Sequence, residues 1–288
     1  MKEYKVSGIE FFDWRDGGYC TINQCGIETT YPFKEVETKF PIQAVLMDLD
    51  GTTVISEEFW IYLIEKTIKQ ISSPDFCLSE EDTPYVSGFS TAEHLEYCLK
   101  KYGIDKSVNQ ALDIYHKTAR FELNEIMEGR GNIDAFKPRT GLKEFLYALK
   151  KAGIKIGLAT SGLDYKAIPE IVSAFRVLDM GDPIEFYDAI ITGGRRKGEG
   201  EYGTIGEIAV KPHPWIYAEL VTSLNIDKSH AIVLEDSSAG LIAGRLAGMN
   251  VIGFSDGNLV QSGLSEETTL LVDSFADILK WLRIKNEN

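Results

Sequence analysis

Residues 43–52 read QAVLMDLDGT, an apolar run that passes directly into two aspartates and a glycine. The run Gln43–Met47 does not alternate apolar with polar side chains, which is typical of a strand buried on both faces. Further runs of this kind are Ile154–Ala159, Ala189–Thr192, Ala231–Leu234, Val251–Phe254 and Leu270–Val272. Helix-period segments separate the later runs, so the sequence predicts an α/β fold with a parallel sheet between two layers of helices.

Apolar residues at helical spacing predict three helices around the later strands. The first stripe runs from Leu142 to Leu149 and ends before Gly153, a residue typical of a helix C-terminus. The other two stripes lie in Pro214–Leu224 and Phe275–Leu282. Each of these helices would pack one apolar face against the sheet.

The domain organisation follows from where strand-like runs are missing. The stretch between the first two strands carries helical stripes at Trp60–Ile71, Leu95–Leu99 and Val108–Ala119. We therefore expect a helical insertion over residues 57–136 within a core formed by residues 41–56 and 137–288. Residues 1–40 are expected to form a β extension, with a hairpin around the turn Asp16-Gly17. This extension could pack on the core, lengthen its sheet or build a dimer contact.

Composition limits the class of partner. The 288 residues include 30 Lys and Arg against 44 Asp and Glu, a net charge of −14. A surface this acidic repels phosphate backbones and anionic lipids, which disfavours nucleic-acid and membrane partners. The four cysteines, Cys20, Cys25, Cys77 and Cys98, fit neither a disulfide framework nor a zinc set and are expected to be free thiols. With no apolar leader and no long apolar run, we expect a cytoplasmic protein, monomeric or homodimeric.

Polar groups follow several of the predicted strands at the point where each strand ends. Asp48 and Asp50 follow the first strand, Thr160-Ser161-Gly162 follows the second, and Glu235-Asp236 follows Ala231–Leu234. A lysine at a rigid turn, Lys211-Pro212, precedes that last strand. The carboxyl ends of parallel strands meet at one edge of a sheet, so these groups should lie together. Clustered carboxylates repel each other unless a cation lies between them, which indicates a metal site.

These residues resemble the four motifs of the haloacid dehalogenase-like hydrolases. The family's D-x-D-G-T, strand-end Ser/Thr, Lys-Pro and acidic pair fall at Asp48–Thr52, Thr160, Lys211-Pro212 and Glu235-Asp236. The resemblance covers roughly residues 42–283 and implies a three-layer Rossmann-like core. The insertion resembles the helical cap of the β-phosphoglucomutase and phosphoglycolate phosphatase branch. In that branch, a loop like Gly88-Phe89-Ser90-Thr91 meets the substrate.

The resemblance implies a phosphoryl-transfer mechanism at the first motif. Asp48 is expected to be the nucleophile and to form an aspartyl-phosphate. Asp50 is expected to protonate the leaving alcohol and then to deprotonate water. Mg²⁺, a hard cation that prefers oxygen ligands, would be held by Asp48, the main-chain carbonyl of Asp50, Asp236 and Glu235, the last directly or through water.

The other two motifs are expected to hold the transferring phosphate. The hydroxyl of Thr160 and the amides of Ser161 and Gly162 would donate hydrogen bonds to its oxygens, and Lys211 would supply a positive charge. Together these residues predict a Mg²⁺-dependent phosphatase that acts on a small metabolite or sugar phosphate.

Particular residues bear on three alternative functions. Asp50 argues against a dehalogenase, because a halide leaving group needs no proton. A phosphomutase of the β-phosphoglucomutase type stays open, although Ile55 and Trp60 stand where those mutases place an Asp and a His. A non-catalytic phosphate-binding or regulatory module would have been favoured by loss of Asp48 or Asp236, and both are present.

Several other residues carry weaker expectations. The pattern G-x-G-x-x-G at Gly198–Gly203, in a glycine-rich loop, holds two glutamates and predicts no dinucleotide site. His213 is expected at a helix start and His94 on a helix surface. Trp60 and Tyr62 could line the pocket, yet Trp60 also fits the core stripe. No role is assigned to Arg139.

Overall fold

A computed structural model describes residues 3–6, 9–12, 18–24, 27–79, 82, 91–194 and 210–284. Its main sheet has six parallel strands in the order β12-β11-β10-β5-β8-β9. The bounds are β5 (Ala44–Asp48), β8 (Lys155–Ala159), β9 (Ala189–Ile191), β10 (Ala231–Glu235), β11 (Asn250–Phe254) and β12 (Leu270–Val272). All six predicted strands are confirmed. β5 lies inside the sheet with every residue buried, as its uninterrupted apolar run predicted.

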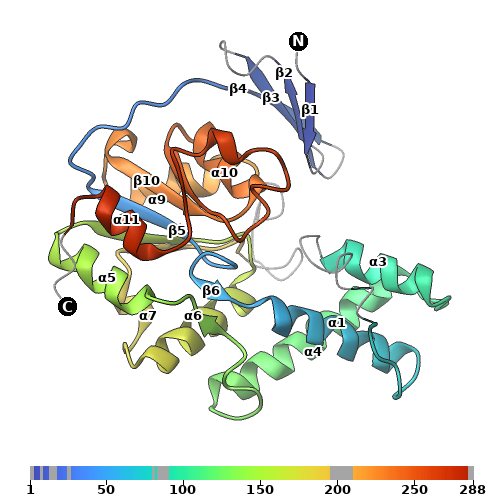
Figure 1. Ribbon diagram of the computed structural model, residues 1–288. Coiled ribbons are helices and arrows are strands. Elements are labelled where there is room, and N and C mark those ends of the chain that lie inside the picture. The colour runs from blue at the N-terminus through green and yellow to red at the C-terminus, as the bar shows by residue number, and fades with distance from the viewer. Residues whose placement is uncertain are drawn as a thin grey trace.

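Helices cover both faces of this sheet (Figure 1). Their bounds are α5 (Leu142–Lys151), α6 (Asp164–Leu178), α7 (Pro183–Phe186), α9 (Trp215–Ser223), α10 (Ser238–Leu246) and α11 (Phe275–Trp281), with short 3₁₀ helices at Lys228–His230 and Ser265–Glu267. On one face α5 and α11 meet through stacked rings of Phe145 and Phe275, 4.5 Å apart. On the other, Leu220 of α9 and Leu241 of α10 pack in one core with β-strand residues. The predicted three-layer α/β core is therefore confirmed.

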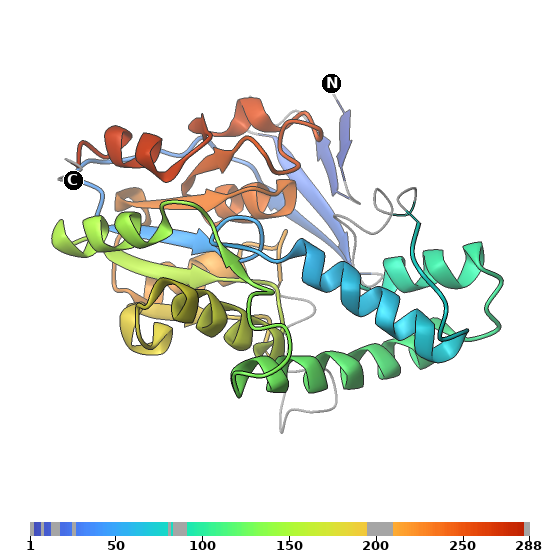
Figure 2. The ribbon, with the colours of Figure 1, turned by 60° about the horizontal axis from the view of Figure 1, so that its bottom comes forward.

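The helical insertion leaves and rejoins the core through a two-stranded ladder. β6 (Val54–Ile55) pairs antiparallel with β7 (Lys137–Pro138), and between them lie α1 (Glu57–Ile71), α3 (Thr91–Lys101) and α4 (Val108–Met127). Figures 1 and 2 both place these helices beyond the end of the sheet toward which β5 points. The insertion therefore stands over the edge where the predicted site residues collect, while its role as a closing cap stays a prediction.

The N-terminal extension is larger than the predicted hairpin. Four antiparallel strands, β1 (Glu3–Val6), β2 (Ile9–Phe12), β3 (Tyr19–Gln24) and β4 (Ile27–Pro32), form a sheet in chain order. The predicted β2–β3 pairing is confirmed, with Phe12 opposite Tyr19, and the turn itself lies outside the described residues. Cys20, Ile22 and Phe33 are buried in one cluster with α9 and α10. Of the three options, the extension therefore packs on the core.

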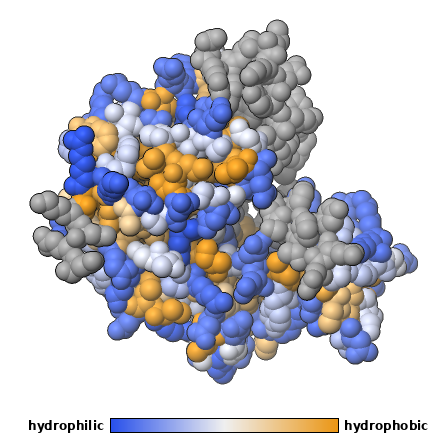
Figure 3. Space-filling model, viewed as in Figure 1, coloured by the Kyte–Doolittle hydropathy of each residue, from blue (hydrophilic) through white to orange (hydrophobic). Residues whose placement is uncertain are grey.

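The exterior is mostly hydrophilic on the face shown in Figure 3, with hydrophobic residues in scattered groups between the hydrophilic ones. Of the helices in the described part of the chain, none is long and apolar enough to cross a bilayer. Cys20, Cys77 and Cys98 are free thiols, as predicted, and Cys25 falls outside the described residues.

Asp82 anchors the insertion by accepting hydrogen bonds from four side chains. Its fully buried carboxylate accepts from Tyr97 (2.9 Å), Lys101, Tyr102 and Ser79. Burial alone would raise the pKa of Asp82, but the hydrogen bonds from Lys101, Tyr102 and Ser79 outweigh it and lower that pKa. A carboxyl whose pKa is lowered by folding stabilises the fold above its unfolded pKa of about 3.9, and this contribution is lost as the pH falls.

Asp82→Asn is therefore expected to lower the free energy of unfolding by about 1–3 kcal/mol at pH 7, because the four donors lose their charged acceptor. The difference from wild type should shrink as the pH falls below about 4. Thermal unfolding across this pH range measures both effects, with the exposed Asp105→Asn as control. A difference that stayed constant with pH would contradict the ionised state of Asp82.

Candidate active site

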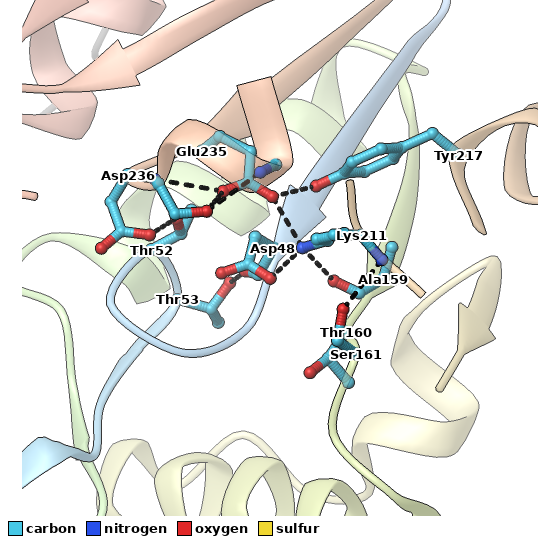
Figure 4. Close-up of polar contacts among 12 residues, drawn as sticks. Asp48, Thr52, Thr53, Ala159, Thr160, Ser161, Lys211, Tyr217, Glu235 and Asp236 are labelled. Atoms are coloured by element: carbon cyan, nitrogen blue, oxygen red, sulfur yellow. Dashed lines mark hydrogen bonds and ion pairs between the residues drawn. The ribbon is translucent and has the colours of Figure 1, made fainter. Parts of the chain in front are cut away.

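The centre of the site is an ion pair at the carboxyl end of β5. Asp48 closes that strand and is buried, and the Lys211 ammonium contacts its Oδ1 (Figure 4). The same ammonium donates to the main-chain carbonyl of Ala159 at 3.3 Å, at the end of the neighbouring strand β8. Burial alone would lower the pKa of Lys211, but the charges of Asp48 and Glu235 raise it, so this lysine carries a firm positive charge.

Glu235, at the end of β10, holds Lys211 from the other side. Its Oε1 pairs with the ammonium at 2.6 Å and accepts a hydrogen bond from the Tyr217 hydroxyl, also at 2.6 Å. Its Oε2 accepts from the hydroxyl of Ser237 at 3.0 Å. A carboxylate engaged by three donors is fixed in orientation, so Glu235 positions Lys211. Tyr217 had no predicted role, because nothing in a helical stripe reveals which ring reaches a strand end.

Three carboxylates lie close enough to share a cation. Ligand oxygens of Asp48, Glu235 and Asp236 are all within 4.8 Å of one another. Burial, and next the charge of Glu235, raise the pKa of Asp48 well above its usual range and that of Asp236 to about 7. A hard cation among these oxygens would offset the repulsion that raises both values, so the residues fit Mg²⁺.

We call the segment Thr160–Gly162 after β8 the cradle, because it contains the residues predicted to hold the phosphate. The Gly162 amide donates to Thr160 Oγ1 at 2.9 Å, and the Lys211 amide donates to Ser161 Oγ at 3.2 Å. The second bond ties the lysine loop to the cradle (Figure 4). Thr160, Ser161, Gly162 and Lys211 therefore lie together, as the strand-end argument predicted.

Asp50 is half-buried next to the cradle. One of its carboxylate oxygens accepts two hydrogen bonds, and the other faces Gly162. Its Oδ1 accepts from Ser56 Oγ at 2.6 Å and from the indole nitrogen of Trp60 at 3.0 Å. Its Oδ2 lies 4.0 Å from the point that a Cβ on Gly162 would occupy. The side chain of Asp50 is outside the acidic cluster, so the predicted metal contact through its main-chain carbonyl stays a prediction. The proton transfer predicted for Asp50 would use Oδ2, the oxygen next to Gly162.

The comparison with known families decides the identity of this arrangement. The sequence model of the haloacid dehalogenase-like hydrolases matches residues 45–254, which is more than half of the chain. The chain is a haloacid dehalogenase-like hydrolase. The resemblance drawn from the four motifs is confirmed.

Individual relatives of this hydrolase are distant in sequence, but most of the length of each one aligns with this chain. Protein CbbY of Cereibacter sphaeroides is 27% identical over 239 residues, which cover 82% of this chain and 94% of the relative. A phosphorylated carbohydrates phosphatase of Thermotoga maritima is 23% identical over 211 residues, covering 73% of this chain and 84% of that protein. The crystal structure of CbbY from Rhodobacter sphaeroides in complex with phosphate superposes with a TM-score of 0.63 at 23% identity, covering 84% of this chain and all of that one. The fold is that of the family, and phosphatases are among its relatives, which is consistent with a phosphoric monoester hydrolase.

Trp60 of the hydrolase has a position that the sequence left undecided. It is half-buried against Phe136, as a core residue would be, with ring centroids 5.7 Å apart. Its indole nitrogen nevertheless donates to Asp50, so it also belongs to the site. Because Trp60 is on α1, a residue of the insertion directly touches the expected acid and base of the core.

Glu170 on α6 is a residue of the site that the sequence analysis did not predict. It is buried beside Asp50 and Ser56, and burial, followed by the charge of Asp50, raises its pKa well above the usual range. A neutral carboxyl is therefore favoured here, since a second negative charge next to Asp50 would be repelled. The residue lies one position after a proline inside a helical stripe, and no sequence pattern points to it.

Arg139 was given no role, and the structure corrects this. Its guanidinium donates to the carbonyls of Gly51 and Thr52, 3.1 Å from each, and pairs with Asp256 at 2.9 Å. It thereby clamps the loop that follows Asp50. That loop needs glycine, because Gly51 has φ +81° and a Cβ there would lie 2.2 Å from Asp236 Oδ2.

The remaining predicted residues divide into described and undescribed ones. His213 precedes α9, as predicted for a helix start, and its buried ring bonds the Tyr31 hydroxyl of β4 at 2.7 Å. His94 is half-buried in α3 rather than on its surface. Tyr62 is exposed and donates to Glu122 at 3.4 Å. Gly88-Phe89-Ser90 and the glycine-rich stretch from residue 195, including Gly198–Gly203, lie outside the described residues.

Proposed function

We propose that this hydrolase is a Mg²⁺-dependent phosphatase of small metabolite or sugar phosphates that works through an aspartyl-phosphate on Asp48. The observation that carries the proposal is that Asp48 contacts the Lys211 ammonium and also belongs to the acidic cluster with Glu235 and Asp236. A buried carboxylate in that position can approach a phosphorus atom whose oxygens face positive charge. The carbohydrate phosphatase among the relatives supports the class of substrate.

The residues divide the reaction into two displacements. A carboxylate oxygen of Asp48 attacks phosphorus, the bond to the leaving oxygen breaks, and Asp50 Oδ2 gives that oxygen its proton. Water then attacks the aspartyl-phosphate, Asp50 takes the proton from that water, and phosphate leaves with Asp48 restored. Lys211 and the Thr160–Gly162 segment hold the phosphoryl oxygens throughout. Mg²⁺, when bound by Asp48 and Asp236 with the Asp50 carbonyl, would screen the two negative groups that meet in the first step.

The decisive experiment measures phosphate release from a panel of sugar and metabolite phosphates, with Mg²⁺ or with EDTA. We expect release with Mg²⁺ and none with EDTA. The same mixtures should be checked for isomerised phosphate, because that product without release would establish the phosphomutase. Neither product from any substrate would favour the non-catalytic phosphate-binding or regulatory module and overturn the proposal.

Trp60→Phe is expected to reduce kcat about tenfold for esters with alkoxide leaving groups, because Asp50 loses a donor that holds it. The loss should be small for p-nitrophenyl phosphate, whose leaving group departs without a proton. Steady-state rates on both ester types measure this difference. Trp281→Phe, at the ring that meets Phe40, is the matched control. Equal losses on both esters would show that Trp60 acts through the fold and not through Asp50.

A further inference from the structure

Lys166 lies where the core meets the helical insertion. It belongs to the first turn of α6, four residues after Gly162 of the cradle. Its ammonium lies 4.2 Å from the ring centroid of Trp60 and 5.2 Å from that of Tyr115. These rings come from α1 and α4 of the insertion. A single cation of the core is therefore faced by two aromatic rings of the insertion.

This cation is close to the path that the leaving group must take. The phosphorus of a substrate would lie between Asp48 and the cradle, and its leaving oxygen would lie at Asp50 Oδ2. The carbon skeleton attached to that oxygen must then extend past Asp50 toward the insertion. The Trp60 indole touches Asp50 on one side and carries the Lys166 ammonium over its ring. The skeleton therefore meets Lys166 soon after it passes Asp50.

Lys166 differs from the lysines of the insertion in that no carboxylate of the described residues pairs with it. Over the described ranges, no carboxylate lies in ion-pairing distance of its ammonium, although acidic residues outnumber basic ones in the chain by 44 to 30. The paired lysines of the insertion are Lys66 with Glu122, Lys69 with Glu65, Lys100 with Glu96, and Lys101 with Asp82. An ammonium that has no carboxylate partner in the described part of the chain, and that lies beside Trp60 in so acidic a protein, is suited to an anionic ligand.

His94, Trp60 and Tyr115 add no positive charge beside Lys166. Burial lowers the pKa of the half-buried His94 to about 4, Glu93 opposes this shift, and the charge of Lys166 adds to it. His94 is therefore neutral near pH 7, and the rings of Trp60 and Tyr115 are uncharged. His94 therefore adds no positive charge to that of Lys166.

We propose that Lys166 binds a second anionic group of the substrate, so that the preferred esters carry a phosphate or a carboxylate on the leaving group. This inference rests on the proposed phosphatase function and adds the class of ester. The ammonium would form a charge-assisted hydrogen bond to the second group while the cradle holds the first. A neutral leaving group would leave Lys166 on the Trp60 ring.

The test compares matched esters on the wild-type enzyme and on Lys166→Met. Glycerol phosphate against phosphoglycerate tests the carboxylate, and fructose monophosphate against fructose bisphosphate tests the second phosphate. We expect the wild type to favour the doubly anionic member of at least one pair. Lys166→Met should lower kcat/KM for that member about 10- to 100-fold, as expected for one charge-assisted hydrogen bond. For the member whose leaving group is uncharged, called the neutral member, kcat/KM should stay within about twofold.

Two further variants make the result specific. Lys166→Arg should keep the preference, since it keeps the charge. Lys117→Met removes the same charge from an exposed position of α4 and should change neither member. Equal losses on both members of a pair would mean that Lys166 only packs on Trp60, and a wild-type preference for neutral esters would also overturn the inference. No turnover of any ester would overturn the phosphatase itself, and this inference with it.

Discussion

Asp48→Asn is expected to lower the rate of phosphate release by about 10³-fold or more, because an amide oxygen cannot replace the carboxylate nucleophile. The side chains have nearly the same shape, so the contacts around position 48 should persist. Phosphate release under saturating Mg²⁺ measures the loss. Asp105→Asn, at an exposed position of the insertion, is the control for removal of one negative charge. Retained release in Asp48→Asn would mean that another group attacks phosphorus.

The same variant should not destabilise the metal-free protein. Burial and the charge of Glu235 raise the pKa of Asp48, which means that its ionised form is less favourable in the fold than in the unfolded chain. Removing that charge relieves the repulsion, and Lys211 keeps Glu235 as a partner. Thermal unfolding in EDTA should therefore give a Tm equal to or above that of wild type. A clear fall in Tm would show that the Asp48–Lys211 attraction outweighs the repulsion within the acidic cluster.

Lys211→Met is expected to abolish activity and to lower the free energy of unfolding of the metal-free protein by about 3–5 kcal/mol. The Lys211 side chain is 6% exposed and its ammonium faces Asp48 and Glu235, so its loss leaves two buried carboxyl groups without a cation. Denaturant unfolding in EDTA measures the effect. Lys143→Met is the matched control, because Lys143 donates at 2.6 Å to the main-chain carbonyl of Leu178 and to no carboxylate among the described residues. Its loss should cost about 1 kcal/mol.

A second substitution separates charge from shape in this prediction. Glu235→Gln in the Lys211→Met background removes one of the uncompensated charges and keeps an oxygen for Tyr217 to bond. The double variant should recover part of the stability and none of the activity. If it is no more stable than Lys211→Met, the loss comes from the cavity left by the lysine and not from unpaired charge.

The sequence was informative wherever a residue's place follows from the backbone alone. A strand buried on both faces has to be apolar throughout, and its carboxyl end has to lie at one edge of the sheet. For that reason the gathering of Asp48, Thr160, Lys211, Glu235 and Asp236 could be predicted. The motifs added chemical roles, which depend on the family resemblance and not on spacing.

Side-chain direction set the limit of that prediction. Trp60 is in a helical stripe, and only the rotation of α1 decides that its nitrogen reaches Asp50. Arg139 and Glu170 lie far from Asp50 in the sequence and reach its surroundings through the return of the chain at β7 and the packing of α6. The two outer strands of the N-terminal sheet, Glu3–Val6 and Ile27–Pro32, were not predicted either.

The N-terminal sheet has a practical consequence for anyone who trims this chain. The family match begins at residue 45, after the whole extension. A shortened chain starting there would lose Cys20, Ile22 and Phe33, and water would reach the apolar side chains of α9 and α10 that they now cover. It would also lose the hydrogen bond between the Tyr31 hydroxyl and His213, which lies two positions after Lys211 of the site. Such a fragment should aggregate, although it would contain every motif by which the family is recognised.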